Sequence, residues 1–260
     1  MANKLAWLAC TLLAVTACSN SSLARQDGGH YTILYRSAWH AGIDPRLTIQ
    51  APRPDAIATV AMPQFHGVAL KATMRRADDF THVANGTPRA EVVFARDAHF
   101  AVGKDYEVRW STMIPPAYRL DSQQPEIITQ LHQSGFTGSP PFALMLSGGH
   151  YQVDVRGGAG TPSQSYTFGT PAADAGRVVT WRLHYRPDDQ GTRALTDLYK
   201  DGVRVVHSMG RPNAYPGDQN AYLKIGIYKW WWQTRPSDVD ERTMYYGDVE
   251  IAEQVPNSLP

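Results

Sequence analysis

Hydrophobic and polar residues alternate in short runs along the chain after residue 30, and no long apolar stripe has the spacing of a helix. Such runs, separated by Gly, Pro, Asp and Asn, predict β-strands. The pairs Gly148-Gly149 and Asp201-Gly202 stand between neighbouring runs and favour tight hairpins. The expected strands are Ile57–Val60, Gly67–Thr73, Arg89–Phe94, Tyr106–Ile114, Glu126–His132, Phe142–Ser147, His150–Arg156, Val178–Tyr185, Ala194–Lys200, Val203–Ser208, Ala221–Lys229 and Met244–Glu250. The pattern predicts an all-β fold, one domain of two packed antiparallel sheets.

The clearest alternation lies in Tyr222–Tyr228, where the odd-numbered residues are aliphatic and are expected to face a core. The opposite face carries an unusual row: Tyr222, Lys224, Gly226 and Tyr228. A glycine inside a strand often marks the close approach of a ligand or of another backbone. Two phenols and an ammonium around it suit an anionic polymer with sugar-like faces. The alternative is a Tyr- and Trp-rich edge that packs on a loop.

Three tryptophans follow this strand. If the strand continues past Lys229, Trp230 and Trp232 share one side. They would then stack on sugar rings, or else cover the edge of the sandwich.

Two further strands have polar faces. Gln130 and His132 are two residues apart and share a face, whereas Ile127 and Leu131 are expected to face away. This places an amide donor beside a titratable base, although a lone His is also commonly a half-buried structural residue. Arg89 and Glu91 form a similar pair, either an exposed ion pair of little worth or a guanidinium that Glu91 orients towards a carboxylate ligand.

The first residues predict export. A charged start, Met1–Lys4, precedes an apolar run that ends at Ala17, too short to span a bilayer. Small residues directly before Cys18 resemble a lipoprotein signal, so we expect residues 1–17 to be removed, Cys18 to be lipidated and residues 18–29 to form a polar tether. The alternative is ordinary cleavage near Ala24. The lipoprotein reading predicts an outer-membrane or periplasmic protein that contacts the membrane only through its anchor.

Composition limits the remaining possibilities. The only cysteines, Cys10 and Cys18, lie in the signal, so the domain at residues 30–260 has no disulfide and depends on its core. The formal net charge is only +1, so the protein lacks the strongly positive field that is typical of nucleic-acid binders. An anionic ligand must therefore be attracted locally. We expect a monomer.

The polar faces together supply what one reaction needs. A uronic-acid polymer is cleaved by β-elimination when a base removes the C5 proton, donors neutralise the adjacent carboxylate, and an acid protonates the leaving oxygen at C4. Arg, Gln, His, Lys and Tyr match these tasks. This chemistry requires no metal or organic cofactor.

The motifs Arg89-x-Glu91, Gln130-x-His132 and Tyr222–Tyr228, in this order, resemble the signature strands of jelly-roll alginate lyases. The flanking sequences resemble still more the polysaccharide lyase family that contains glucuronan lyases and is related to jelly-roll heparin lyases. The resemblance runs from about residue 88 to residue 251 and implies a β-jelly-roll.

Roles follow from the resemblance, residue by residue. It implies that His132 is the base and Tyr228 the acid, that Arg89 and Gln130 neutralise the carboxylate, and that Lys224 holds the chain. The further residues expected to contact the substrate are Tyr222, Glu91, Trp230 and Trp232. A calcium ion is sometimes bound in this family, and Asp218 and Asn220 are possible oxygen ligands. The expected substrate order is polyglucuronate, then alginate, then sulfated heparin-like chains.

Two other functions compete. A non-catalytic glycan-binding module would use the same face but would tolerate the loss of His132 or Tyr228. A sandwich glycoside hydrolase needs two carboxylates across the scissile bond. The usual signature of two Glu flanking an Asp at alternating positions is absent, and Asp238–Glu241 lies in a polar, loop-like stretch.

Overall fold

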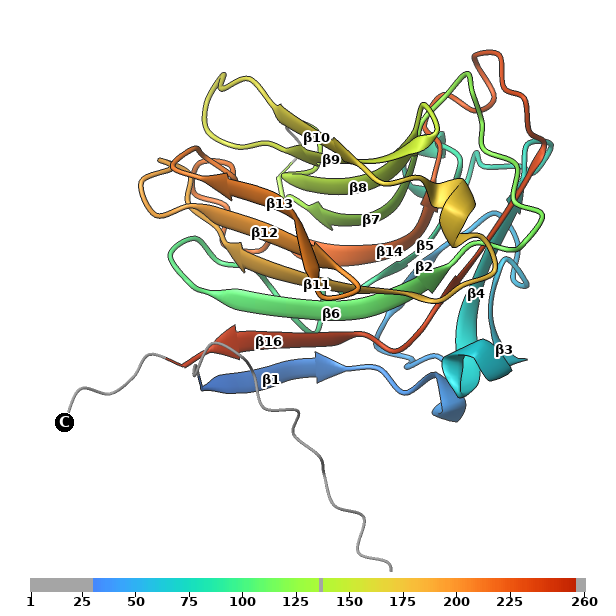
Figure 1. Ribbon diagram of the computed structural model, residues 1–260, viewed down its shortest axis with the longest axis horizontal. Coiled ribbons are helices and arrows are strands. Elements are labelled where there is room, and N and C mark those ends of the chain that lie inside the picture. Colours follow the sequence, from blue (N-terminus) through green and yellow to red (C-terminus); the bar gives the residue numbers. More distant parts are fainter. Residues whose placement is uncertain (1–29, 136–137, 256–260) are drawn as a thin grey trace, which may run out of the picture.

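The chain forms two antiparallel β-sheets packed face to face, as seen in a computed structural model (Figure 1). The structure describes residues 30–135 and 138–255. The predicted signal, Cys18 and the tether lie outside the described residues. The predicted sandwich and the all-β class are confirmed. No helix among the described residues is long and apolar enough to cross a membrane.

Within the described residues, one sheet has nine strands and the other has seven. The first runs in the order β13 (Val203–Met209), β12 (Leu195–Lys200), β11 (Val179–Arg186), β6 (Tyr106–Met113), β15 (Glu241–Tyr246), β4 (Gly67–Arg75) and β3 (Ile57–Met62), while β16 (Glu250–Gln254) pairs with β6 and with β1 (Tyr31–Arg36). The second runs β10 (Gln164–Phe168), β9 (His150–Val155), β8 (Phe142–Ser147), β7 (Glu126–His132), β14 (Tyr222–Tyr228), β5 (Arg89–Val93) and β2 (Thr48–Gln50). Short 3₁₀ helices lie at Trp39–Ala41, Pro63–Phe65, Ala84–Gly86 and Pro171–Asp174.

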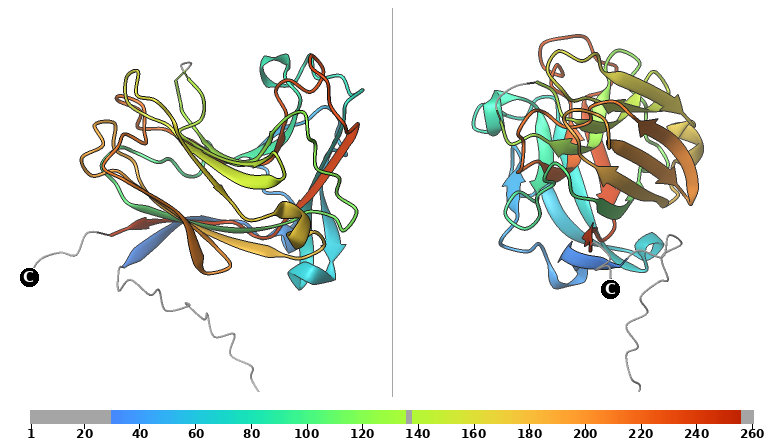
Figure 2. Two further views of the ribbon diagram at one scale, coloured as in Figure 1. Left: turned by 45° about the horizontal axis from the view of Figure 1, so that its top comes forward. Right: turned by 90° about the vertical axis from the view of Figure 1, so that its left-hand side faces the viewer.

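The core lies between the two sheets. Leu223, Ile225 and Ile227 of β14 are fully buried in it, as their alternation predicts. Trp181 of β11 stacks on Trp110 of β6 with ring centroids 6.2 Å apart. With one face of the seven-stranded sheet in the core, its polar face points outward. Figure 2 shows that this outward face is concave and that loops rise at both of its ends.

The two predicted hairpins are present. Gly148 and Gly149 join β8 to β9, and Asp201 and Gly202 join β12 to β13, with φ between 49° and 82° at all four residues. Two consecutive residues with positive φ match the twist of the flanking strands, and Gly or Asp adopts that conformation most readily.

Some strands were not predicted from the sequence, and one predicted strand is two strands in the structure. The strands β1, β2 and β10 were not predicted, and the expected run Met244–Glu250 is divided into β15 and β16. The interruption follows from side-chain competition for the backbone. The carbonyl of Gly247 accepts a hydrogen bond from Trp39 Nε1 (2.8 Å), and the amide of Val249 donates to Ser37 Oγ (2.7 Å).

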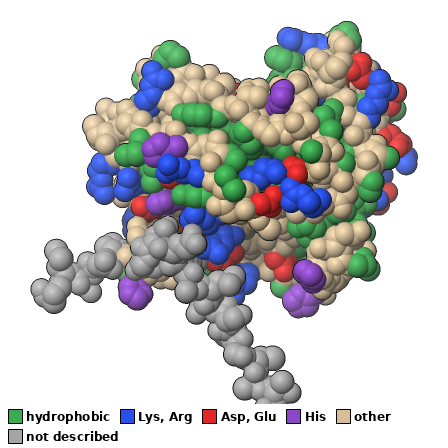
Figure 3. Space-filling model, viewed as in Figure 1, with side chains coloured by type: hydrophobic (Ala, Val, Ile, Leu, Met, Phe, Trp, Pro, Cys, Tyr) green, Lys and Arg blue, Asp and Glu red, His purple; other side chains and the backbone are tan. Residues whose placement is uncertain are grey.

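The exposed face of the nine-stranded sheet carries both positive and negative side chains. On the face shown in Figure 3, Lys and Arg side chains lie beside Asp and Glu. For example, both carboxylate oxygens of the buried Glu107 are paired, one with Arg109 and one with Arg182. This balance agrees with the net charge of +1.

A buried ion pair joins the sheets and allows a stability prediction. Arg242 and Glu126 have side chains 2% and 1% exposed, and Arg242 Nε donates to Glu126 Oε2 at 2.7 Å. Arg242→Met leaves the carboxylate buried without its cation, so the free energy of unfolding should fall by about 3–5 kcal/mol. Chemical denaturation measures this change. The matched control is Arg75→Met, because the Arg75–Glu241 pair is exposed and its loss should change stability little.

Candidate active site

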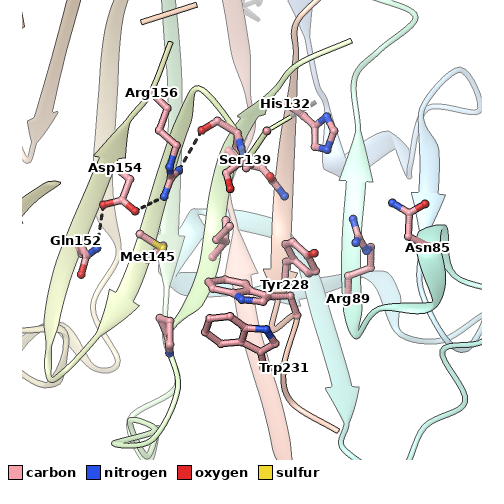
Figure 4. A pocket seen from close by; sticks show the side chains of 16 residues that line it. Asn85, Arg89, His132, Ser139, Met145, Gln152, Asp154, Arg156, Tyr228 and Trp231 are labelled. Carbon is pink, nitrogen blue, oxygen red and sulfur yellow. Dashed lines mark hydrogen bonds and ion pairs between the residues drawn. The ribbon is translucent and has the colours of Figure 1, made fainter. Parts of the chain in front are cut away.

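A cleft of about 490 Å3 lies on the concave face of the seven-stranded sheet (Figure 4). Its floor comes from β5, β7, β8, β9 and β14, and loops form its rim. The lining residues are Asn85, Arg89, Pro125, Ile127, Gln130, His132, Gly138, Ser139, Pro140, Met145, Gln152, Asp154, Arg156, Tyr228, Trp230 and Trp231. All three strands with predicted polar faces therefore contribute to one cavity.

Strand pairing brings these three strands together, with β14 in the middle. On one side, Tyr222 lies opposite His132 and Lys224 lies opposite Gln130 of β7. On the other side, Tyr228 lies opposite Arg89 of β5. Neighbouring strands are about 4.8 Å apart. The three motifs therefore lie side by side on one sheet, as expected.

Gly226 is required by a close backbone contact. It lies opposite Glu91, has φ +132°, and a Cβ atom there would lie 2.1 Å from the carbonyl oxygen of Ala90. Of the two reasons expected for this glycine, the approach of another backbone is the one that the structure provides.

A β-bulge changes the direction of one predicted side chain. Pairing of β7 with both neighbours shifts around Ile128, so that Ile128 joins the core and Ile127 lines the cleft. The prediction that Ile127 faces the core was therefore wrong, because an extra residue reverses the alternation. The hydroxyl of Tyr246 in β15 lies 2.9 Å from the carbonyl oxygens of both Ile128 and Gly226 and so supports the bulge.

The guanidinium of Arg89 is held on three sides within the cleft wall. Its Nη1 lies 3.3 Å from Glu91 Oε2, its Nη2 bonds Thr87 Oγ1, and its Cζ lies 4.0 Å from the centre of the Tyr228 ring. The other oxygen of Glu91 accepts a hydrogen bond from Gln130 Nε2. Glu91 thus orients the guanidinium, as one of its two expected roles requires.

His132 is arranged as a neutral base. Its Nδ1 lies 2.7 Å from the carbonyl oxygen of Gln133. A carbonyl can only accept, so Nδ1 carries the proton and Nε2 keeps its lone pair. The ring stacks on Tyr222 with centroids 5.3 Å apart. Burial, followed by the nearby charge of Lys224, lowers the pKa of His132 below its usual 6.5 and keeps the imidazole neutral.

Lys224 lies beneath the cleft rather than in it, which corrects the expectation that it grips the polymer. Only 2% of Lys224 is exposed, and its Nζ lies 3.1 Å from Gln50 Oε1 and 3.8 Å from Glu91 Oε2. Burial lowers its pKa, against the attraction of Glu91. Neither Lys224 nor Glu91 lines the cleft, whereas Arg89 and Gln130 do, so both expected substrate contacts are supports of the cleft floor. Tyr222 is half-buried and supports the ring of His132.

One of the two tryptophans predicted to contact the substrate, Trp232, is placed differently from the prediction. β14 ends at Tyr228 and the chain turns, so the alternation beyond Lys229 does not hold. Trp232 is fully buried, and its Nε1 donates to the carbonyl of Val239 at 3.0 Å. Trp232 is therefore a core residue and not a substrate contact. Trp230 and the unpredicted Trp231 line the cleft instead.

The residues on the far side of the cleft were not predicted from the sequence. Gln152, Asp154 and Arg156 line it from β9 and the residue after it. The signal was available, because three polar residues at alternating positions share a strand face. Met145 of β8 was missed because an apolar residue on an open face looks like a core residue. Asn85, in the turn at Ala84–Gly86, also lines the cleft.

Asp218, one of the two possible calcium ligands, takes part in hydrogen bonds within the protein. Both carboxylate oxygens of Asp218 accept hydrogen bonds from Ser134, and one of them also accepts from the backbone N–H of Asn220. Within residues 30–135 and 138–255, no three His, Cys, Asp or Glu side chains group as metal ligands. Through these hydrogen bonds Asp218 links its own loop to Ser134. We assign no reaction step to a metal.

Solved structures with this fold include polysaccharide lyases. Endo-β-1,4-glucuronan lyase from the fungus Trichoderma reesei is 15% identical, with a TM-score of 0.61 over 78% of this chain and 89% of that one. Alginate lyase A1-II′, a member of polysaccharide lyase family 7, is 14% identical, with a TM-score of 0.57 over 80% and 95%. An alginate lyase from Pseudomonas aeruginosa is 14% identical, with a TM-score of 0.53 over 79% and 97%. These likenesses confirm the jelly-roll fold.

The family is shown by the sequence itself. No curated protein matches the chain. The model of a family described as "Polysaccharide lyase", however, matches residues 33–250. That match covers the described domain almost from end to end, including all of the cleft-forming strands. The chain therefore belongs to the polysaccharide lyase family.

Proposed function

We propose that this protein cleaves a uronic-acid polysaccharide by β-elimination and leaves an unsaturated uronate at the new end. The observation that carries the proposal is that Arg89, His132 and Tyr228, from three strands, line a single cleft. A cation, a neutral base and a phenol are the three kinds of group that the elimination needs.

Arg89 is suited to receive the carboxylate next to the reacting carbon. Its planar fork is held by Glu91 and Thr87 and is stacked on Tyr228, so little side-chain entropy is lost when a carboxylate binds. Negative charge moves onto this carboxylate as the C5 proton leaves, and a fixed cation stabilises that charge. One N–H of Gln130 is used by Glu91; the second N–H of that amide can support the same carboxylate.

Proton transfer is assigned to His132 and Tyr228. The lone pair on His132 Nε2 takes the proton from C5. The electrons of the broken C5–H bond then form the C4–C5 double bond, and the electrons of the C4–O bond leave with the oxygen. The hydroxyl of Tyr228 gives its proton to the leaving oxygen. Exchange with water returns both groups to their starting states. In glucuronate and mannuronate the C5 proton and the C4 oxygen lie on the same side, so Tyr228 alone could serve both steps there.

The neighbours support a uronate substrate. Their names give glucuronan and alginate as the substrates of similarly folded lyases. One crystal structure holds a variant of alginate lyase A1-II′, with a His replaced by Asn and a Tyr by Phe, in complex with a substrate. This pair of residue types is the pair assigned here. A non-catalytic module would have no need of a neutral His and a phenol in one cleft.

Polyglucuronate should be cleaved faster than alginate, and alginate faster than heparin. The cleft-lining cations are the two arginines, Arg89 and Arg156, among the described residues, which leaves few partners for sulfate groups. Residues 30–260 should be incubated with each polymer at equal uronate concentration while the ultraviolet absorbance of the new C4–C5 double bond is followed. Faster elimination on heparin would reverse the order, and absence of the double bond with every polymer would refute the proposed function.

A further inference from the structure

The far side of the cleft contains a second oriented arginine. Arg156 Nη1 donates to the carbonyl of Pro140 at 3.1 Å, and its Nη2 donates to Asp154 Oδ2. The other oxygen of Asp154 accepts hydrogen bonds from Gln152 Nε2 (2.9 Å) and Ser165 Oγ (2.6 Å). Figure 4 shows Arg156, Asp154 and Gln152 on the opposite side of the cleft from Arg89.

This arrangement repeats the one around Arg89. In both places an arginine pairs with an acid two residues away on the same strand face, and a glutamine amide donates to the second oxygen of that acid. Glu91 and Asp154 are both nearly buried. Each of these acids orients a guanidinium that lines the cleft. Within the described residues, Arg156 uses only two of its five side-chain N–H donors, so others can bind a ligand.

The two arginines are far enough apart to bind different sugars of one chain. Arg89 lies on β5 and Arg156 directly follows β9, with β14, β7 and β8 between them. Four strand spacings of about 4.8 Å place them roughly 19 Å apart along the sheet.

Part of the floor between them is apolar. Ile127, Ala143 and Met145 form a separate cluster on this face, with Tyr228 and Trp230 packed against it. Such a surface suits the C–H faces of sugar rings.

We propose that Arg156 forms a second carboxylate-binding subsite, which holds a uronate several sugars away from the bond that is cleaved. This inference rests on the proposed function, since it assumes that a polyuronate lies across the sheet from Arg89 to Arg156. The subsite contributes to binding in the ground state and in the transition state alike. Its loss should therefore raise KM and leave kcat unchanged.

The test is Arg156→Met on a graded series of oligoglucuronates and on the polymer. Loss of a charge-assisted hydrogen bond should raise KM for the polymer about tenfold. KM for the shortest oligosaccharide that is cleaved should not change, because it cannot span the cleft. Arg156→Gln, which keeps a donor for the Pro140 carbonyl, is the second variant and should show the same loss if the methionine variant does not fold.

Arg177→Met is the matched control. Arg177 also pairs with a nearby acid, Asp174, but does not line the cleft. It should leave KM unchanged at every length. A polymer KM equal to that of the wild type in the Arg156 variants, or a rise that is the same at all lengths, would overturn the subsite. Failure of the proposed function gives a different result, because the wild-type protein would then form no double bond on any uronate polymer.

Discussion

Tyr228→Phe should lower kcat on a uronate polymer by about 10²–10⁴-fold with little change in KM, because general acid catalysis contributes about that factor. The substitution removes the hydroxyl and keeps the ring, so the contact with the Arg89 guanidinium, 4.0 Å from the ring centre, is retained. The loss should therefore come from the proton donor alone. Steady-state kinetics on one defined polymer, followed through the double-bond absorbance, measure both constants.

Tyr199→Phe is the matched control for this prediction. Tyr199 lies on β12 in the other sheet, and the guanidinium of Arg182 lies 3.8 Å from its ring centre. Tyr199→Phe also removes a phenolic oxygen from a ring that lies against a guanidinium. Because this ring is far from the cleft, kcat should not change. Turnover close to that of the wild type in Tyr228→Phe would refute the assignment of this residue and would favour a non-catalytic glycan-binding module.

His132→Ala should also reduce kcat by about 10²–10⁴-fold if His132 takes the C5 proton. The wild-type protein then needs the neutral imidazole. Because burial and the charge of Lys224 lower the pKa of His132 below 6.5, kcat/KM should be constant near neutral pH and should fall as the pH drops through that lowered pKa. A pH profile of kcat/KM for the wild type checks this limb.

The size of the His132→Ala effect identifies the base. If Tyr228 both removes the C5 proton and protonates the leaving oxygen, His132→Ala will be much milder than Tyr228→Phe. His132 would then help to position the carboxylate. Equal losses in the two variants, together with the acid limb, assign the base to His132. A wild-type profile of kcat/KM with no acid limb below the usual pKa of histidine would contradict that assignment.

The polar strand faces predicted much of the site. Arg89, Gln130, His132 and Tyr228 all line the cleft, because a period of two assigns each residue to a face before the strands are paired. Arg156 and Asp154 followed the same rule and could have been found in the same way.

Errors arose where the alternation is interrupted. Because of the bulge at Ile128, Ile127 faces the cleft and not the core. Because the chain turns after Tyr228, Trp231 lines the cleft and Trp232 is buried, the reverse of the prediction. The division between β15 and β16 has the same origin, since Ser37 and Trp39, distant in sequence, bond the backbone there.

The amino-acid sequence by itself determined the all-β class, the two hairpins and the side chains that face outward, because alternation and turn residues act over a few neighbouring positions. Tertiary structure alone decided how deep each polar side chain lies. In the sequence, Lys224 and His132 each stand on the polar face of an alternating strand. In the structure, the ammonium of Lys224 is buried against Glu91 and Gln50, whereas the imidazole of His132 reaches the cleft. Burial depends on the curvature of the sheet and on neighbours from other strands, and neither is written in the local sequence.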